Sequence, residues 1–371
     1  MKLGEALSFR NGKTSPDRSE GGMYQVHGSN GVIGYCNQSN APAGATVIGR
    51  VGSYCGNVHF LQSDSWVTDN AIFAFPKADQ DPRYWYFVLC HLKLGKLRHG
   101  SGQPLLNQEI LSGVDFDPQT LSEQRRIAGV LGALDDKIES NCAQQRIGEQ
   151  LLRAVIEGIL GQFSEADFIS FDAYCTQSKE SVRPENIGNG DKYIALEHMP
   201  RGSVFLNSWE TAKLAGIASN KTRFRHGDLL FGKLRPYFKK VGVAPVSGVC
   251  STDILVIRPR LPEFLPFIAV IASSDALIDS ISASATGTRM PRASWKEIAT
   301  WSVPQIPDET LTVLLHPANQ LMAFLETLSL QNLKLAQLRD ALLPELMSGR
   351  MRVDEAGCLV SEALDEEVAD V

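Results

Sequence analysis

The run from residue 221 to residue 240 has the strongest chemical character in the chain. Seven basic residues stand there against one acid, Asp228, and four aromatic residues are interleaved with them. Guanidinium and ammonium groups beside aromatic rings suit contacts with phosphates and with base edges. We therefore predict that this run contacts DNA through Lys221, Arg223, Arg225, Lys233, Arg235, Tyr237, Lys239 and Lys240. An amphipathic hairpin whose charges are merely solvated is the alternative.

Polar and basic side chains recur at matching places elsewhere. The segment of the first half that matches the basic run supplies Arg50 and Tyr54. The other residues predicted to face DNA are Lys13, Arg98, Ser101, Gln103 and Asn107 in the first half, and Thr288, Arg289 and Arg292 in the second. Polar loop residues at equivalent places in the two halves suit a surface that faces DNA. Polar loops without a ligand are the alternative.

Residues 227–233 have the spacing of a phosphate-binding loop, but their surroundings argue against one. The pattern should continue with Ser or Thr for magnesium, and Leu234 follows instead. Pro236 prevents the helix that should open there, and the apolar residues 229–231 are typical of a strand. A nucleotide-using enzyme is therefore the weaker interpretation of this segment.

The sequence lacks the usual signatures of catalysis. It has no G-x-S-x-G elbow, no methyltransferase tetrad of Asp or Asn, two prolines and an aromatic residue, and no glycine-rich loop after a strand. The seven histidines lack metal-ligand spacing, and the seven cysteines stand singly without a C-x-x-C pair. We predict no catalytic residue, no metal ligand and no cofactor bound by this chain.

Two long segments, about residues 120–162 and 311–348, carry apolar residues at alternating steps of four and three. This repeat is typical of helices with one narrow seam, and the middle of each seam here is polar. Ser122 suits the cap of the first helix, and Gly349 suits a stop after the second. The predicted seam residues are Ile127, Leu131, Leu134, Ile138, Leu152 and Val155 in the first helix, and Leu321, Phe324, Leu328, Leu335, Leu338 and Leu342 in the second. Because both segments are longer than an ordinary globular helix, we expect them to pair as a coiled coil. The alternative is that each packs only on its neighbouring domain.

The segments before the two helices, residues 1–118 and 164–308, are rich in glycine, proline, serine and short β-prone runs. They are predicted to be compact, loop-rich domains of mixed α/β (α+β) class. Short similarities recur at the nearly constant offsets of 183, 184 and 185 residues: Gly49 with Gly232, Asp69 with Asp253, and Gly102 with Gly287. An internal duplication with pseudo-twofold architecture follows from this repeat.

Charge divides unevenly along the chain. The whole net charge of −6 lies in residues 351–371, which we predict to be an acidic, flexible tail. A neutral body with one basic run suits a component of an assembly. No apolar run approaches the ~20 residues of a membrane span, and the N-terminus has no apolar signal core. With single cysteines, these features favour a cytoplasmic protein with no membrane partner.

Five segments carry a family resemblance. They are GSGQPLLN at residues 100–107, LSEQRRIA at 121–128, LDDKI at 134–138, LLFGKLRP at 229–236 and LLPELMSGR at 342–350. Together with the repeated order of domain and helix, they resemble the specificity (S) subunits of type I restriction–modification systems. The resemblance extends from residue 1 to about residue 353.

This resemblance implies two target recognition domains, residues 1–118 and 164–308, each reading one half of a bipartite, asymmetric DNA site. It implies that the helices in residues 119–163 and 309–350 form an antiparallel coiled coil. The coiled coil would set the spacer between the half-sites and dock two modification (M) subunits. S-adenosylmethionine, Mg and ATP are then expected on the M and restriction (R) subunits, with double-stranded DNA as the common partner.

The role implied for this chain is therefore DNA recognition without catalysis. Two other functions remain open from the sequence. One is a duplicated coiled-coil scaffold that binds proteins at both ends, and the other is a specificity module of another restriction system.

Overall fold

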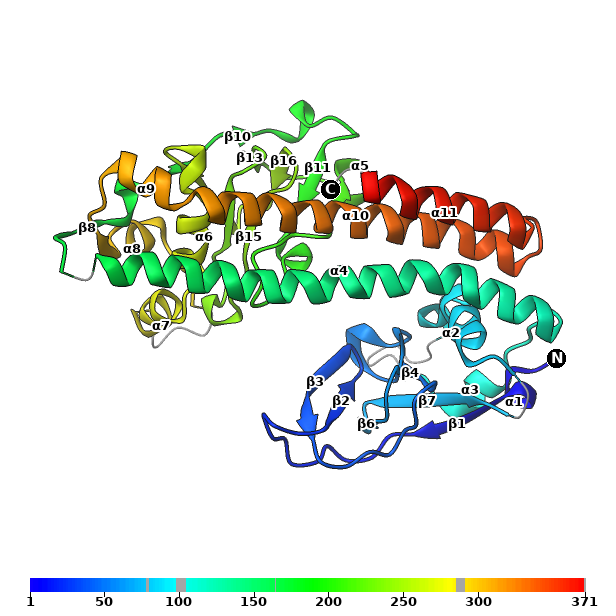
Figure 1. Ribbon diagram of the computed structural model, residues 1–371. Coiled ribbons are helices and arrows are strands. Elements are labelled where there is room, and N and C mark those ends of the chain that lie inside the picture. The colour runs from blue at the N-terminus through cyan, green and yellow to red at the C-terminus, as the bar shows by residue number, and fades with distance from the viewer. Residues whose placement is uncertain (78–79, 98–104, 164, 285–290, 370–371) are drawn as a thin grey trace. The chain divides into compact units, whose positions relative to one another are not determined.

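The computed structural model describes residues 1–77, 80–97, 105–163, 165–284 and 291–369 (Figure 1). The chain divides into two compact units. Unit 1 consists of Met1–Asp136 and Leu335–Val371, and unit 2 consists of Lys137–Lys334. Two long helices, α4 (Leu121–Gln162) and α10 (His316–Met347), run through both units. Each unit therefore holds one globular domain and part of each long helix.

The domain of unit 1 contains two small sheets with helices beside them. Its strands are β1 (Leu7–Asn11), β2 (Tyr24–Gly28), β3 (Gly31–Cys36), β4 (Thr46–Gly49), β5 (Val58–Phe60), β6 (Ser65–Val67) and β7 (Ala71–Pro76). Its helices are α1 (Leu3–Ala6), η1 (Gly52–Tyr54), α2 (Pro82–His91), η2 (Leu94–Leu97) and α3 (Gln108–Ser112). One sheet is antiparallel in the order β1-β7-β4-β5, and the other has the order β3-β2-β6 with β2 and β6 parallel.

The apolar strands and helix α2 form the core of this domain. Strand β4 is buried along its whole length, and α2 packs against β5 and β7. The start of helix α2 is fixed by two residues. Pro82 is suited to the first turn, and the Asp81 side chain accepts a hydrogen bond from the Tyr84 N–H at 2.9 Å.

The domain of unit 2 is larger and contains three sheets. Its strands are β8 (Phe168–Ser170), β9 (Cys175–Ser178), β10 (Ser181–Val182), β11 (Lys192–Ile194), β12 (Glu210–Thr211), β13 (Lys221–Phe224), β14 (Leu229–Gly232), β15 (Val241–Val243), β16 (Gly248–Cys250), β17 (Ile254–Pro259) and β18 (Ser302–Pro304). Its helices are η3 (Phe171–Ala173), η4 (Pro184–Asn186), η5 (Leu196–His198), α5 (Ala212–Ala215), η6 (Pro236–Phe238), η7 (Pro262–Phe264), α6 (Leu265–Ala272), α7 (Asp275–Ser284), α8 (Trp295–Ala299) and α9 (Asp308–Leu314). The sheets have the orders β15-β14-β17-β9, β10-β13-β16-β11-β12 and β18-β8.

The two units repeat one sheet topology. The antiparallel order β1-β7-β4-β5 of unit 1 corresponds to β9-β17-β14-β15 of unit 2, and the parallel pair β2 and β6 corresponds to β11 and β16. Strands β4, β5, β6 and β7 each begin 183 residues before β14, β15, β16 and β17. The register repeats as well, since Ile48 faces Ile72 in unit 1 and Phe231 faces Leu255 in unit 2. The structure confirms the predicted duplication.

One of the predicted equivalences needs a correction. The Arg50 N–H donates to the Asn70 carbonyl in unit 1, and the Lys233 N–H donates to the Asp253 carbonyl in unit 2. Asn70, rather than Asp69, is therefore the structural counterpart of Asp253, and the offset is 183 here too. The predicted match of Gly102 with Gly287 lies outside the described residues.

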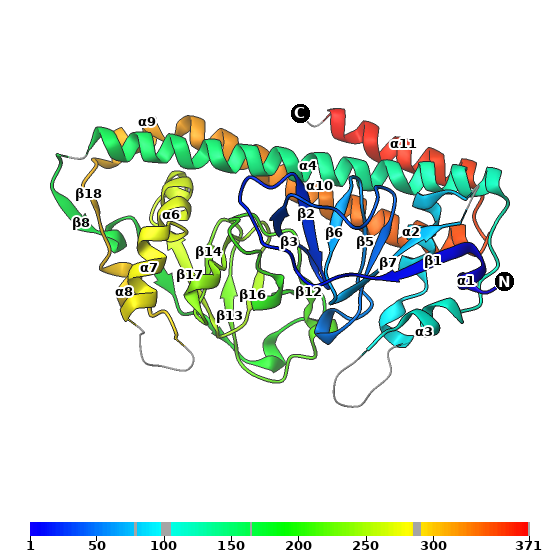
Figure 2. The same cartoon turned by 90° about the horizontal axis from the view of Figure 1, so that it is seen from below.

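Helices α4 and α10 lie side by side and run in opposite directions (Figures 1 and 2). Within unit 1, the Arg339 side chain pairs with Asp135 at 2.7 Å. Within unit 2, the Gln145 side chain donates to Ser329 at 2.5 Å. Residue numbers thus rise along one helix as they fall along the other, which confirms the predicted coiled coil in its antiparallel form.

Most of the predicted seam residues are buried, but the seam of α10 is wrong at one position. Buried residues are Ile127, Leu131, Leu134, Leu152, Leu328, Leu335 and Leu342, and half-buried residues are Ile138, Val155, Leu321 and Leu338. Phe324 is 39% exposed, whereas Met322 and Leu325 are buried. The reason is that this part of α10 also packs on the core of unit 2, which turns its buried stripe away from Phe324.

The ends of the long helices differ slightly from prediction. Thr120, rather than Ser122, caps α4, since its hydroxyl accepts a hydrogen bond from the Glu123 N–H at 3.4 Å. The second segment is divided into α9 and α10, because Pro317 cannot continue a helix from the residues before it. Gly349 has φ of 70° and follows α10 as the predicted stop.

The acidic segment after α10 is helical, so its prediction as a flexible tail is wrong. Helix α11 (Val353–Ala369) buries Val353, Ala356 and Val360 within unit 1. These residues recur at steps of three and four and form an apolar stripe, which the count of acidic residues had concealed. Asp354 also pairs with Arg126 of α4.

No single helix in the described ranges has the length and apolar composition to span a membrane. The segments Pro262–Ala272 and Asp275–Ala283 meet that test only as a pair bent by 58°. Helix α6, within this pair, is a buried helix of the unit 2 core.

Candidate DNA-contacting site

Each unit carries the same hairpin between two strands of its antiparallel sheet. Tip 1, residues 50–57, joins β4 to β5, and tip 2, residues 233–240, joins β14 to β15. The Gly49 N–H donates to the Asn57 carbonyl in unit 1, and the Gly232 N–H donates to the Lys240 carbonyl in unit 2, both at 2.8 Å. The two tips are therefore built on one main-chain frame.

One further main-chain hydrogen bond holds the base of each tip. The Leu106 N–H donates to the Arg50 carbonyl at 3.0 Å, and the Ala293 N–H donates to the Lys233 carbonyl at 2.9 Å. The frame is tight at Gly49, where a Cβ atom would lie 2.2 Å from the Tyr54 carbonyl oxygen. Glycine is needed there because the chain returns so closely on itself.

The tips differ where the backbone is left-handed. Gly52 and Gly56 of tip 1 have φ of 76° and 92°. Their counterparts in tip 2 are Arg235 and Lys239, with φ of 51° and 50°. A side chain with a Cβ atom adopts this conformation at a cost of about 1–2 kcal/mol. Tip 2 thus keeps basic side chains at two places where the other copy has glycine, and such strain gathers at functional sites.

Each tip presents one tyrosine to solvent at the same position. Tyr54 and Tyr237 are both 49% exposed. The Tyr237 ring meets the Phe238 ring edge to face, with centroids 4.8 Å apart. An exposed ring on a fixed hairpin can stack on a base or sugar and can donate its hydroxyl hydrogen to a phosphate.

The basic run of residues 221–240 does not form one hairpin. Strand β13 belongs to the sheet of β10 and β16, whereas β14 belongs to the sheet of β15 and β17. Lys221 is only 8% exposed, and its ammonium donates to Ser219 O at 3.0 Å and Ser219 Oγ at 2.8 Å. Burial lowers the pKa of Lys221. The structure thus places Lys221 inside unit 2 rather than at its surface, which argues against the predicted contact with DNA.

Other cations of the run have partners within unit 2. Arg223 and Arg225 both approach Glu180, at 3.5 and 3.9 Å. The Lys233 ammonium donates to the Thr252 carbonyl at 2.6 Å, and Lys240 donates to the Leu196 carbonyl. Asp228, the acid of the run, is 2% exposed and pairs with Arg258 at 2.7 Å.

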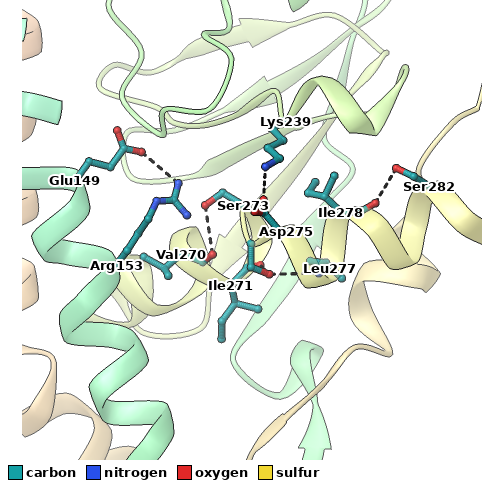
Figure 3. A network of polar contacts seen from close by, with 11 residues as sticks. Glu149, Arg153, Lys239, Val270, Ile271, Ser273, Asp275, Leu277, Ile278 and Ser282 are labelled. Atoms are coloured by element: carbon teal, nitrogen blue, oxygen red, sulfur yellow. Dashed lines mark hydrogen bonds and ion pairs between the residues drawn. The ribbon is translucent and has the colours of Figure 1, made fainter. Parts of the chain in front are cut away.

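Lys239 and Asp275 form an ion pair at the start of α7 (Figure 3). Hydrogen bonding and attraction by Lys239 lower the pKa of the Asp275 carboxyl. In the same view, Arg153 of α4 reaches Glu149 at 3.4 Å (Figure 3). The buried Glu149 carboxylate also accepts the Val204 N–H at 2.8 Å. These bonds fasten tip 2 and the loop at residue 204 to their surroundings.

Arg235 is the freest cation of the run. Among the described residues it has no side-chain hydrogen bond or ion pair, and its side chain is exposed. It stands two residues before Tyr237 in tip 2. Arg235 and Tyr237 are thus the predicted residues that the structure leaves available to a ligand in this unit.

In unit 1, the predicted residues have different environments. Lys13 is exposed beside a main-chain bridge to Thr68. Arg50, the first residue of tip 1, is half-buried, and its Nε atom has no hydrogen-bond partner among the described residues. Asn107 caps α3, because its side chain accepts the Ile110 N–H at 2.8 Å, so it has a structural role.

The remaining predicted residues lie next to the tips or outside the description. Arg292 is exposed, pairs with Asp253 at 3.4 Å and bridges Leu234, as Leu105 bridges Val51 in unit 1. Arg98, Ser101, Gln103, Thr288 and Arg289 lie outside the described residues.

Sequence reasoning missed one cation near tip 2. The Arg201 guanidinium lies over the Phe238 ring, 4.1 Å from its centroid, and the residue is exposed. Arg201 is far from the basic run in the chain, and nothing in the local sequence marks it. Only the folding of the preceding loop onto Phe238 brings it to the tip.

A family model for the type I restriction modification DNA specificity domain matches residues 1–147. The type I restriction enzyme EcoDI specificity subunit of Escherichia coli is 25% identical over 139 residues, which are 38% of this chain and 31% of that protein. The EcoprrI specificity subunit of Escherichia coli is 24% identical over 153 residues, which are 39% of this chain and 38% of that protein. The chain thus matches roughly a third of the length of these relatives.

A solved structure resembles the chain over almost all of its length. The S subunit of a type I restriction–modification system from M. genitalium aligns with a TM-score of 0.57 at 14% identity, covering 93% of this chain and 95% of that one. At this identity the likeness shows the fold. Residues 1–147 therefore match the type I restriction modification DNA specificity domain, and the chain as a whole shares the fold of the M. genitalium S subunit.

Proposed function

We propose that this chain is the DNA sequence-specificity subunit of a type I restriction–modification complex. Its two domains read the two halves of a bipartite, asymmetric site, and the coiled coil of α4 and α10 determines the spacer. Two modification subunits dock on the chain and carry S-adenosylmethionine, and restriction subunits with Mg and ATP complete the complex. The chain itself supplies recognition without catalysis, in the cytoplasm.

The observation that carries this proposal is the repeated hairpin. Tip 1 and tip 2 have the same main-chain bonds and the same exposed tyrosine, although the residues around Tyr54 and Tyr237 differ. One frame with two different sets of side chains is what a pair of readers needs for two different half-sites. The matches of this chain and its fold to specificity subunits support the same conclusion.

The test is to change each tyrosine alone in the complex with modification subunits. Tyr54→Ala is expected to relax the bases read in one half-site, and Tyr237→Ala is expected to relax the other. Loss of a base contact lowers discrimination at one position by about 1–3 kcal/mol. Methylation-sensitive sequencing of a randomised site library measures both half-sites at once.

Tyr35→Ala is a matched control, because Tyr35 is 43% exposed on β3 of unit 1 but lies outside tip 1. It should leave both half-sites unchanged. If Tyr54→Ala and Tyr237→Ala alter the same positions, or alter none, the two tips are not separate readers.

A further inference from the structure

A layer of polar side chains interrupts the apolar seam between α4 and α10 in unit 2. Asn141 and Gln145 of α4 are buried there, with Asn141 0% exposed, and they meet the buried Ser329 and Gln331 of α10. Apolar residues occupy the seam between this layer and the C-terminal end of α4, among them Leu152. The polar layer, defined as Asn141, Gln145, Ser329 and Gln331, is thus set into an otherwise hydrophobic contact.

Side-chain hydrogen bonds join the two helices across the polar layer. Gln145 Nε2 donates to Ser329 Oγ at 2.5 Å and to the Leu325 carbonyl at 2.9 Å. Asn141 Nδ2 donates to Gln331 Oε1 at 3.4 Å. Each bond links one particular residue of α4 to one of α10, so together they mark a single alignment of the helices.

The polar layer is a poor way to gain stability. Within the described part of the chain, Asn141 Oδ1 is buried without a hydrogen-bond partner. A buried polar atom without a partner loses its hydration and gains nothing in return. Well-packed apolar residues in place of a buried polar group are often neutral or stabilising. The layer therefore calls for an explanation other than stability.

A close contact beside the layer marks the same alignment. A Cβ atom on Gly148 would lie 2.5 Å from Leu325 Cδ2, so the Leu325 side chain fills the space that this glycine leaves open. In a slipped pairing Leu325 would meet a residue with a larger side chain. Gly148 and Leu325 thus fit each other only when the polar layer is also matched.

Without the polar layer and the contact between Gly148 and Leu325, the two helices could slip past each other by one heptad. Leucine would then face leucine again, as in any coiled coil with an apolar repeat. With the polar layer, a shift of α10 by seven residues sets Asn141 against Phe324 or Leu338 instead of Gln331. It sets Gln145 against Met322 or Ala336 instead of Ser329. Every such shift leaves several buried polar groups without partners.

We propose that the polar layer locks the register of the coiled coil and so restricts the protein to one spacer length. A single buried polar position is known to fix register in coiled coils at the expense of stability. The part of this inference that concerns the spacer rests on the proposed function. The part that concerns register stands on the contacts alone, and the two parts are tested separately.

Register is tested by a thiol crosslink between α4 and α10. Asn332 Nδ2 lies 3.5 Å from the Cys142 sulfur, so Asn332→Cys places a second thiol beside Cys142 only in the observed alignment. Cys358, which is exposed, is changed to Ser in every variant to remove a competing thiol. Treatment with a short bifunctional thiol reagent and peptide mass spectrometry then measures the fraction of chains linked between positions 142 and 332.

The lock variant combines Asn141→Leu, Gln145→Leu and Gln331→Leu. We expect its crosslinked fraction to fall at least threefold, with a melting temperature equal to or above that of the parent. The matched control combines Gln144→Leu, Gln150→Leu and Gln337→Leu, three exposed positions of the same helices, and should crosslink like the parent. Equal crosslinking of the lock variant and the parent overturns the proposal. Asn141→Leu alone gives a milder second variant, for which a smaller fall is expected.

Spacer length is tested in the complete complex with its modification subunits. Methylation-sensitive sequencing of a library with variable spacers should find one spacer for the parent and the control, and two or more for the lock variant. One unchanged spacer in a lock variant that no longer crosslinks overturns the link between register and spacer. If the parent complex methylates no bipartite site, the proposed function fails, and the crosslinking result still decides the register.

Discussion

Gly52 and Arg235 occupy the same position on two copies of one hairpin, and both have a left-handed backbone. Glycine adopts this conformation freely, whereas arginine does so at a cost of about 1–2 kcal/mol. The arginine is exposed and has no side-chain partner within the part of the chain that the structure describes. Tip 2 therefore holds a strained cation, two residues before Tyr237, whose side chain makes no hydrogen bond or ion pair with the described residues.

Arg235→Gly separates the folding role of this position from its role in binding. Glycine relieves the left-handed conformation, and this offsets its greater freedom in the unfolded chain, so the melting temperature should stay level or rise slightly. DNA binding by the complex should weaken, and the slope of log affinity against log salt should become shallower by about 0.9 for one lost phosphate contact. Titration of labelled duplex at several salt concentrations measures both quantities.

Lys213→Ala is the control for this experiment, because Lys213 is an exposed cation on α5 that lies outside tip 2. It removes the same charge and should leave the salt slope nearly unchanged. An Arg235→Gly complex with the parent's slope would show that Arg235 does not reach a phosphate.

His27 should make unit 1 sensitive to mild acid. Burial, with a smaller effect from nearby His59, lowers the pKa of His27 from 6.5 to about 4. The unfolded chain therefore takes up a proton between pH 6.5 and 4 that the folded chain refuses. Stability contributed by the neutral ring is complete above pH 6.5 and is lost as the pH falls to about 4, by roughly 3 kcal/mol.

Thermal melts of the parent and of His27→Gln between pH 4 and pH 8 check this prediction. The parent should lose stability more steeply below pH 6.5 than the variant does. Parallel curves for the two proteins would mean that His27 titrates alike in the folded and unfolded chains.

The coiled coil should act as a ruler only when both of its helices are lengthened together. Because α4 and α10 are antiparallel and locked at the polar layer, seven residues added after Ile138 in α4 need seven more after Leu335 in α10. We expect the paired insertion to lengthen the recognised spacer and to leave both half-sites unchanged. An insertion in α4 alone should instead lower the melting temperature, because the apolar seam beyond the insertion is mismatched.

Sequencing of methylated sites from the paired-insertion complex gives the spacer directly. The same spacer as in the parent would exclude the ruler, and an altered half-site would show that the insertion disturbs a domain.

Removal of α11 should affect stability more than recognition. Truncation after Arg350 removes the buried Val353, Ala356 and Val360 and the partner of Arg126. From the burial of these small apolar side chains we expect a loss of roughly 3 kcal/mol in the stability of unit 1. Both half-sites and the spacer should stay as they are, since tip 1 and tip 2 are untouched.

Denaturant unfolding of the truncated chain measures the loss of stability. Methylated-site sequencing of its complex tests whether both half-sites and the spacer are unchanged. A more selective control is Asp354→Asn, which removes the exposed pair with Arg126 and should leave the stability of unit 1 nearly unchanged, because solvent screens such pairs.

The sequence predicted the long helices well because their seams repeat over many turns. The start of α4 was predicted at about residue 120 and is observed at Leu121. Phe324 was misplaced because a heptad pattern cannot show that α10 also packs on a globular core. The acidic tail was misjudged for a related reason, since seven carboxylates masked the apolar stripe that includes Val353 and Val360.

The candidate site was predictable in outline but not in detail. The short similarity around Gly49 and Gly232 located both hairpins. It did not show which cations face solvent, because Lys221 lies in β13 of one sheet, Lys233 follows β14 of another, and only the fold buries the first. Left-handed backbone at Arg235 has no sequence signal, and it becomes visible only when the two copies are compared in three dimensions.

The hydrogen bonds shared by tip 1 and tip 2 join main-chain atoms only. The frame common to the two tips therefore does not depend on side chains, and residues between these anchor points can differ, as Gly52 and Arg235 do. Under the proposed function, a few substitutions at one tip would therefore change the DNA bases read there, while the domain folds as before and the other half-site is still read.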